Sequence, residues 1–288
     1  MPRVLIIGCG FVGEAAADLF HARGWPVAAW THAAESAARL GAVKPYPVEA
    51  RDITDPATFL PPSASPLPPS PDVLVDCVSS GRGGGAEQYR RVYLEGARHL
   101  RAAFPEARFL YTGSTSVYAQ TGGDWVDEDS PAEPARETGR VLCETEATVL
   151  AAPAGGTVAR LAGIYGPGRS ALLRKFLVGE SVIEGDGGRW INQIHRDDAA
   201  LALWHLAQPD ASPGIYNVAD DTPLTQLELH RALADAAGRP LPPFGAVDTQ
   251  RKRGVTSKRV SNARLRALGW QPSFPSFLDW AAEELAKA

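Results

Sequence analysis

The pattern of apolar positions at the start of the chain predicts a strand, a tight turn and a helix, in that order. Residues 4–7 are an unbroken run of β-favouring apolar side chains, which is typical of a strand buried on both faces. Residues 11–23 place apolar side chains three to four positions apart, as a helix with one buried face does, and Gly24 ends the segment. The turn between them carries three glycines with the spacing Gly-x-Gly-x-x-Gly.

Apolar runs and helical patterns continue to alternate through the first half of the chain. Strand-like runs recur at residues 25–30, 73–78 and 108–112, and helical patterns at 35–40 and 89–103. Because parallel strands are joined by helical crossovers, this alternation predicts an α/β protein with a Rossmann-type, doubly wound parallel sheet. Residues 60–71 contain too many prolines for a helix or a central strand, and we interpret them as a surface excursion.

The glycine turn has the chemistry of a phosphate-binding site. Gly8 allows a sharp turn, Gly10 lets a diphosphate approach the backbone, and Gly13 lets the helix pack closely on the strand. The helix then offers unpaired N–H groups and the positive end of its dipole to an anion. Because the turn follows a buried strand and opens a helix, we predict a dinucleotide site. Its residues are Gly8, Cys9, Gly10, Phe11, Val12 and Gly13.

The ends of the next strands predict the rest of the cofactor site. An acid after the second strand would favour NAD through the ribose 2′-OH, but the chain has Thr31 and His32 there, which favours NADP over NAD. Asp52 follows the third strand, where it either caps the next helix or reaches the adenine amine. The loop after residues 73–78 lies at the edge where open α/β sheets bind ligands. The remaining cofactor candidates are Ile53, Val78, Ser79 and Ser80.

Composition and charge narrow the classes of function. The chain of 288 residues has a formal net charge of −4, and its basic cluster at 251–253 is short, so nucleic acid and anionic membranes are not expected partners. Its three cysteines lack metal-ligand spacing, so we expect no metal site, and reduced thiols in the cytoplasm. No apolar run approaches the roughly 20 residues that span a bilayer.

Several motifs give the chain a family resemblance. After the glycine turn they are Gly113-Ser114-Thr115-Ser116-Val117-Tyr118, Asp127-Glu128-Asp129-Ser130-Pro131, Arg160-Leu161-Ala162-Gly163-Ile164-Tyr165-Gly166-Pro167-Gly168, Ile194-His195-Arg196-Asp197-Asp198-Ala199-Ala200 and Gly214-Ile215-Tyr216-Asn217-Val218-Ala219-Asp220-Asp221. In this order they resemble the extended short-chain dehydrogenase/reductase family, which includes nucleotide-sugar epimerases and dehydratases. The resemblance implies an NAD(P)-binding Rossmann domain over residues 1–165. It also implies a smaller, interwoven α/β substrate-binding lobe over 166–288.

The resemblance breaks at the catalytic helix. The family uses Tyr-x-x-x-Lys, in which the lysine lowers the pKa of the tyrosine for proton exchange with the substrate. Here Thr138 and Leu142 occupy these positions, and neither side chain can replace the pair. The departure is similar to atypical members of the family, which keep the nucleotide site without the usual catalytic residues. The resemblance therefore implies cofactor binding and leaves the reaction open.

Few groups remain as candidates for chemistry. Ser114 occupies the family position that orients a substrate oxygen, with a strand-end cap as the alternative. Tyr118 is a second candidate, with packing under its loop as the alternative, and Thr138 is a third. His195 belongs to an Ile-His-x-x-Asp segment that is mainly structural in the family. Candidates for substrate capture, by analogy with the family, are Arg169, Arg174, Arg189 and Asn192.

We therefore expect an NAD(P)-binding, epimerase/dehydratase-like oxidoreductase. Its substrate would be a small hydroxylated or sugar-nucleotide-like molecule, and its acid/base would be non-standard. The alternative is a non-catalytic NAD(P)-binding sensor or interaction protein. Members of the family often dimerise through the helices that correspond to residues 87–103 and 138–150, so the resemblance also implies a homodimer.

Overall fold

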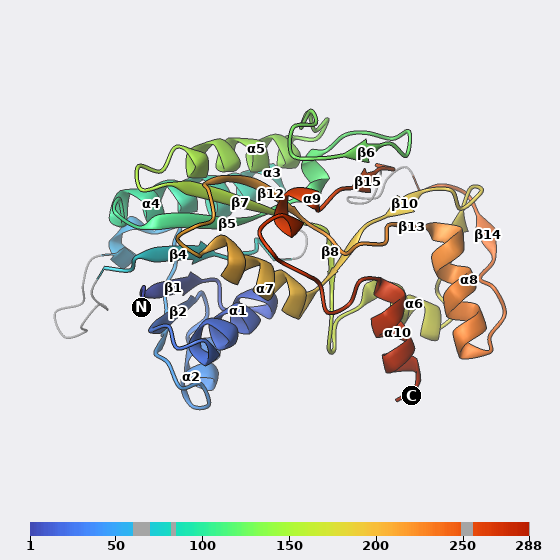
Figure 1. The fold of residues 1–288 in the computed structure, drawn as a ribbon, viewed down its shortest axis with the longest axis horizontal. Coiled ribbons are helices and arrows are strands. Elements are labelled where there is room, and N and C mark those ends of the chain that lie inside the picture. The colour runs from blue at the N-terminus through green and yellow to red at the C-terminus, as the bar shows by residue number, and fades with distance from the viewer. Residues whose placement is uncertain (60–69, 82–84, 249–255, 288) are drawn as a thin grey trace.

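A parallel sheet of seven strands forms the centre of the molecule (Figure 1). The structure is a computed structural model that describes residues 1–59, 70–81, 85–248 and 256–287, so most of the proline-rich stretch and the basic cluster at 251–253 lie outside it. The strands, in spatial order, are β12 (Gly214–Val218), β7 (Gly156–Leu161), β5 (Arg108–Ser114), β4 (Val73–Asp76), β1 (Val4–Ile7), β2 (Val27–Thr31) and β3 (Val48–Ala50). All six neighbouring pairs are parallel, which confirms the doubly wound α/β fold.

Helices cover both faces of this sheet (Figure 1). On one face lie α1 (Phe11–Ala22) and α7 (Arg196–Leu206), with α2 (Ala34–Gly41) beside β2 and β3. On the other face lie α3 (Ala86–Tyr89), α4 (Gly96–Ala103) and α5 (Glu137–Leu150). The single helix predicted at 89–103 is in fact α3 and α4 joined by a π-helical segment, η2 (Arg90–Glu95).

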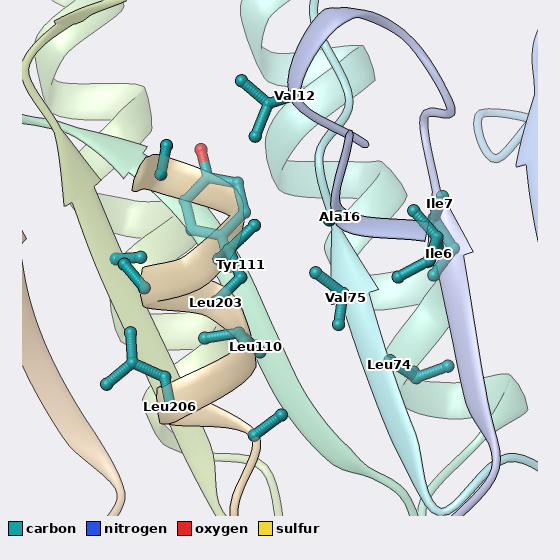
Figure 2. Packing of buried hydrophobic residues seen from close by; sticks show 14 of the residues in the cluster. Ile6, Ile7, Val12, Ala16, Leu74, Val75, Leu110, Tyr111, Leu203 and Leu206 are labelled. Carbon is teal, nitrogen blue, oxygen red and sulfur yellow. The ribbon is translucent and has the colours of Figure 1, made fainter. Parts of the chain in front are cut away.

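Apolar side chains from the sheet and from helices on both of its faces form the main core, part of which is drawn in Figure 2. Ile6, Val75 and Leu110 come from three different strands, and Ala16 and Leu203 come from α1 and α7. Each of these five side chains is at most 2 % exposed. Because helices bury both faces of the sheet, its strands read as continuous apolar runs rather than as alternating patterns.

A smaller lobe, formed by segments of the second half of the chain, lies beside the sheet (Figure 1). Its helices are α6 (Ala171–Leu177), α8 (Gln226–Ala237) and α10 (Phe277–Leu285), which share a second apolar core. Short strand pairs connect them: β8 (Gly163–Tyr165) with β11 (Gln193–His195), β9 (Ile183–Glu184) with β14 (Phe244–Gly245), and β10 (Trp190–Ile191) with β13 (Leu224–Thr225). Since α7 and β12 return to the large sheet after residue 165, the chain is interwoven between the two parts.

The remaining elements are short. They are η1 (Pro56–Phe59), η3 (Thr115–Val117), α9 (Ala263–Arg266) and the pair of β6 (Trp125–Val126) with β15 (Arg259–Val260). Within the described ranges no helix is both long enough and apolar enough to cross a membrane.

Candidate functional site

The three glycines of the turn are required for three different reasons. Gly8 has a φ of +81°, and a β-carbon there would lie 2.7 Å from the amide nitrogen of Val78. A β-carbon on Gly13 would collide with the carbonyl oxygen of Gly8, so α1 can pack this closely on the turn only because residue 13 is glycine. A β-carbon on Gly10 would meet nothing nearer than 4.0 Å. The backbone at Gly10 is therefore the open part of the turn, where a ligand can approach.

Helix α1 begins at this open face without a side-chain cap. Its N-cap residue is Gly10, and no side chain accepts a hydrogen bond from its first turn. The amides of Gly8 and Cys9 are already used, because both donate to the carbonyl oxygen of Trp30, at 3.0 and 2.8 Å. Burial raises the pKa of the Cys9 thiol to about 11, so it adds no negative charge. Phe11 and Val12 open the helix, and this end has the geometry of an anion site that fits a dinucleotide diphosphate.

A carboxylate lies near the end of β2, where the prediction of NADP assumed none. Thr31 is half-buried and the side chain of His32 is 82 % exposed. His32 Nε2 lies 3.6 Å from Oδ2 of Asp52. The expectation that no carboxylate lies near the predicted ribose position is therefore wrong, because β2 and β3 bring Asp52 to His32 from 20 positions away in sequence.

Asp52 is held in a local turn rather than capping a helix. Its Oδ1 accepts hydrogen bonds from the backbone N and the Oγ1 of Thr54, at 2.9 and 2.8 Å. The cap of η1 is Asp55, whose Oδ1 accepts from the amide of Ala57 at 3.0 Å. Burial acts to raise the pKa of Asp52, but the bonds from Thr54 outweigh it and hold the pKa below its usual value. Asp52 is therefore ionised near neutral pH, and the helix-capping interpretation of Asp52 is wrong.

The loop after β4 is fixed by side chains of the helices above it. Ser80 is buried, its amide donates to the hydroxyl of Tyr93 at 3.2 Å, and its carbonyl accepts from Gln88 Nε2 at 2.8 Å. Val78 backs the glycine turn, and its amide donates to Oδ1 of Asp76 at 3.1 Å. Ser79, next to it, is half-buried.

Ile53 lies under α4 rather than at an open edge. It is 6 % exposed, and a β-carbon on Gly96 would lie 2.7 Å from its Cδ1. Its backbone carbonyl lies 2.9 Å from Nδ1 of His99. The side chain of Ile53 therefore packs in the core, and only its backbone remains as a contact for an adenine.

Ser114 and Tyr118, the first two catalytic candidates, differ in accessibility. Ser114 is half-buried at the end of β5, and its Oγ accepts a hydrogen bond from the amide of Ser116 at 3.2 Å, which is the strand-end cap. The hydroxyl keeps its own hydrogen for a second partner. Tyr118 is 0 % exposed, and its hydroxyl donates to Oδ1 of Asn217 at 2.9 Å. Of the two interpretations of Tyr118, the structure therefore favours packing under the loop over a catalytic role.

Helix α5, which corresponds to the predicted catalytic helix, lacks the tyrosine and the lysine of the family. Thr138 is half-buried in the first turn of α5, at the position of the missing tyrosine. Leu142, one turn later, is 7 % exposed and belongs to the main core. The outer face of α5 is charged, with Arg140 bound to Glu137 and Glu144 bound to Arg90. No titratable group replaces the Tyr-Lys pair at these two positions.

The four predicted substrate residues are placed differently. Arg174 is exposed on α6, with Nη1 3.6 Å from Glu180 Oε2. Arg169 lies against the glycine turn, with its Cζ 4.9 Å from the ring centre of Phe11. Arg189 is largely buried, with Nε 3.9 Å from Glu184 Oε2, and burial lowers its pKa. Asn192 fastens the C-terminal segment to the lobe: its Oδ1 accepts from the amide of Val260 at 2.8 Å, and its Nδ2 donates to the carbonyl of residue 258 at 2.9 Å. Asn192 is therefore mainly a positioning residue.

The Ile-His-x-x-Asp segment is structural, as the resemblance implied. His195 is the N-cap of α7, with Nδ1 accepting from the amide of Asp197 at 3.2 Å, and burial lowers its pKa. The Asp198 carboxylate accepts from the amides of Ser273 and Phe274 at 2.7 and 3.0 Å, which fastens the C-terminal segment to α7. Among the described residues, no group of three or more His, Cys, Asp or Glu side chains could hold a metal ion.

One buried acid, Asp76, was not predicted as a candidate from the sequence. Asp76 ends β4 with 0 % exposure, and its Oδ2 has no hydrogen-bond partner among the described residues. Burial raises its pKa to about 7, although the bond from the Val78 amide acts in the opposite direction. An acid inside the apolar run at 73–78 was the available signal, since a charged residue is rarely tolerated in a strand buried on both faces.

The fold and the glycine turn define a Rossmann-type α/β protein with an anion-binding helix start, and comparison with known proteins gives its family. The model of the NAD dependent epimerase/dehydratase family matches residues 4–219, and the chain belongs to this family. The resemblance to extended short-chain dehydrogenases/reductases is thereby confirmed.

Three similar proteins illustrate the relationship. The chain is 28% identical over 287 residues to Protein YeeZ of Escherichia coli K12, covering 96% of this chain and 97% of that protein. It is 30% identical over 220 residues to a 3-diazoavenalumate denitrifying reductase of a Streptomyces species, covering 68% and 72% of the two chains. A solved structure described as a putative NAD-dependent epimerase/dehydratase from Methylobacillus flagellatus is 31% identical, with a TM-score of 0.76 and coverage of 99% and 98%.

Proposed function

We propose that this protein is an NAD(P)-dependent, epimerase/dehydratase-like oxidoreductase of a small hydroxylated or sugar-nucleotide-like substrate. The observation that carries the proposal is the open backbone at Gly10 in front of the uncapped start of α1. A diphosphate fits this arrangement because the helix supplies unpaired N–H donors and positive potential. Membership of an NAD dependent family and the presence of the second lobe both support a cofactor with a substrate beside it.

In this proposal some residues of the chain bind the cofactor and others orient the substrate. A bound NAD(P) would supply the hydride acceptor or donor. The first turn of α1 would hold its diphosphate. Ser114 can donate its hydroxyl hydrogen to a substrate oxygen, since its Oγ lone pair is already engaged by the amide of Ser116. Neither Ser114 nor Thr138 ionises near neutral pH, so proton exchange must involve another group or solvent. The Streptomyces relative is named as a reductase, which supports including reducible substrates in the search.

We propose NADP as the preferred cofactor, with NAD as the alternative. Thr31 and His32 supply no acid at the end of β2 itself, and a histidine can pair with a 2′-phosphate when it is protonated. The carboxylate of Asp52 beside His32 opposes this preference, because it would repel the same phosphate. The difference between the two cofactors is therefore expected to be small.

The test is a titration of the purified protein with NADH and NADPH, followed by hydride-transfer assays on panels of carbonyl compounds and nucleotide sugars. We expect micromolar binding of at least one cofactor, its loss in Gly10→Val, and turnover on a member of a panel. Gly41→Ala is the matched control, since Gly41 lies at the end of α2 and a β-carbon there would meet nothing nearer than 4.0 Å. Unchanged binding by Gly10→Val would show that the cofactor site is misplaced.

The second candidate function is cofactor binding without turnover. It is favoured by the burial of Tyr118 and by Leu142 in the core, which leave α5 and the Ser114 loop without a proton-exchanging tyrosine. Binding of a dinucleotide in the absence of turnover on both panels would support this candidate against the enzyme.

A further inference from the structure

Two arginines from beyond residue 165 lie over the first residue of α1. The Cζ of Arg169 is 4.9 Å and the Cζ of Arg196 is 5.3 Å from the ring centre of Phe11. Phe11 is half-buried and belongs to the glycine turn. Guanidinium groups at these distances from an aromatic face are held there by cation–π attraction. The ring of Phe11 thus fixes two positive charges beside the helix start.

A glycine hairpin brings Arg169 to this place. Gly166 and Arg169 exchange backbone hydrogen bonds of 3.0 and 2.9 Å, which closes a tight turn. A β-carbon on Gly166 would lie 3.1 Å from Cβ of Arg196 and 3.3 Å from Cζ of Phe11. The turn can therefore lie flat against both side chains because residue 166 is glycine.

Only one of these two positive charges is paired with a carboxylate among the described residues. Nε of Arg196 donates to Oδ1 of Asp197 at 2.8 Å, which leaves the other N–H groups of its guanidinium available. The side chain of Arg169 makes no hydrogen bond or ion pair with any residue in the described ranges. Both cations lie beside the positive end of the α1 dipole. Such a concentration of positive charge is favourable only when an anion enters it.

A buried donor without an acceptor faces the same hairpin. His195 is 2 % exposed, and its Nε2 has no hydrogen-bond partner among the described residues. Because its Nδ1 accepts from the amide of Asp197, the proton of the neutral ring lies on Nε2. Nε2 lies 3.3 Å from where the β-carbon of residue 166 would be. The hairpin thus packs closely against Phe11 and the start of α7, with the Nε2 of His195 at the same contact.

We propose that Arg169 and Arg196 form a clamp on the dinucleotide diphosphate, opposite the backbone of the glycine turn. This proposal rests on the proposed function, since it assumes that a dinucleotide binds at Gly10. Guanidinium groups suit a diphosphate because their planar N–H forks can bind two oxygens each. The clamp assigns Arg169 to the cofactor, whereas the resemblance had assigned it to the substrate. It also makes residues beyond 165 part of the cofactor site.

The clamp has a distinctive signature in binding. NADH, NADPH and ADP-ribose share the diphosphate, so all three should lose affinity by the same factor when the arginines are removed. We expect Arg169→Gln and Arg196→Gln each to raise Kd by roughly tenfold and the double variant by roughly 50-fold or more. The salt dependence of Kd should become shallower in the double variant. Arg98→Gln is the matched control, because that arginine is exposed on α4 and pairs with Glu95.

The measurement is calorimetric titration of each variant with the three ligands and with inorganic pyrophosphate, after thermal melting has shown that the variants fold. Equal Kd values in the double variant and the wild type would overturn the clamp, and so would a loss confined to NADPH, which would place the arginines at the 2′-phosphate. If the wild type binds no dinucleotide, the proposed function fails. The clamp would then survive as an anion site only if pyrophosphate binds and the double variant loses it.

Discussion

Arg160 and Glu146 form a buried, bidentate ion pair between the sheet and α5. Arg160 Nε lies 3.0 Å from Glu146 Oε1, and Nη2 lies 2.6 Å from Oε2. Both side chains are only 4 % exposed. The guanidinium also lies 4.9 Å from the ring centre of Tyr118, whose hydroxyl bonds Asn217. The pair therefore fixes both α5 and the segment that follows Ser114.

Removing one member of this pair should be costly. We predict that Glu146→Ala lowers the free energy of unfolding by about 3–5 kcal/mol, because it leaves the Arg160 guanidinium buried without its anion. Urea unfolding followed by circular dichroism measures the change. Glu144→Ala is the control on the same helix, since its exposed pair with Arg90 should contribute little. Similar effects for the two variants would contradict the structural role of the buried pair.

The positions of the missing catalytic pair can be refilled. We predict that Leu142→Lys alone destabilises the protein by on the order of 2–4 kcal/mol at pH 7, because Leu142 is 7 % exposed in the core. Burial would lower the pKa of the new lysine below its unfolded value, so the folded state would bind fewer protons and the deficit should shrink as pH rises towards 10. Thermal melting of Leu142→Lys and of the conservative Leu142→Met between pH 7 and 10 measures this.

Restoring the catalytic pair also tests whether the substrate pocket of the family is intact. If the double variant with Thr138→Tyr and Leu142→Lys turns over a nucleotide sugar that the wild type ignores, the substrate pocket is intact and only the catalytic pair was lost. A folded, cofactor-binding double variant without activity on the panel would instead indicate that the lobe binds a different class of substrate.

Local chemistry explains which features could be predicted from the sequence. The spacing of the glycine turn was sufficient to predict Gly8, Gly10 and Gly13, because the positive φ of Gly8 and the close contact of Gly13 with Gly8 are local features, although the backbone of residues 77 and 78 also crowds Gly8. His195 could be assigned a structural role because it caps the helix that starts at the next residue. In both cases at least one of the interactions lies in the same short segment as the motif.

Long-range contacts explain what was not predicted. The approach of Asp52 to His32 depends on the pairing of β2 with β3, and no local pattern encodes it. The same holds for Arg169 and Phe11, which are separated in sequence by most strands of the sheet. The place of Tyr118 stayed open in the sequence because its partner, Asn217, comes from β12, which joins the sheet only late in the chain.

The contact between His32 and Asp52 predicts a change in cofactor preference. Asp52 is ionised near neutral pH, since hydrogen bonds from Thr54 hold its pKa low against the effect of burial. Asp52→Asn should therefore strengthen NADPH binding relative to NADH by roughly three- to tenfold, because it removes a negative charge near the predicted 2′-phosphate position. Fluorescence titration with both cofactors measures the ratio. Asp55→Asn is the control, since Asp55 caps η1 instead. An unchanged ratio in Asp52→Asn would mean that the 2′ position lies elsewhere.

Asp76 predicts an unusual dependence of stability on pH. Burial raises the pKa of its carboxyl from 3.8 to about 7, so between these values the folded state holds a proton that the unfolded state releases. The slope of the free energy of unfolding against pH is therefore negative: this group makes the protein less stable as pH rises from about 4 to 7, by a total on the order of 4 kcal/mol.

Asp76→Asn keeps the shape of the side chain and cannot ionise. It should melt close to the wild type at pH 5 and at a clearly higher temperature at pH 8. Thermal melts at the two values decide this, with Asp72→Asn as the control on a carboxylate that is exposed and bound to Arg3. If the difference between Asp76→Asn and the wild type is the same at pH 5 and pH 8, Asp76 does not titrate in this range, and a partner must stabilise its charged form.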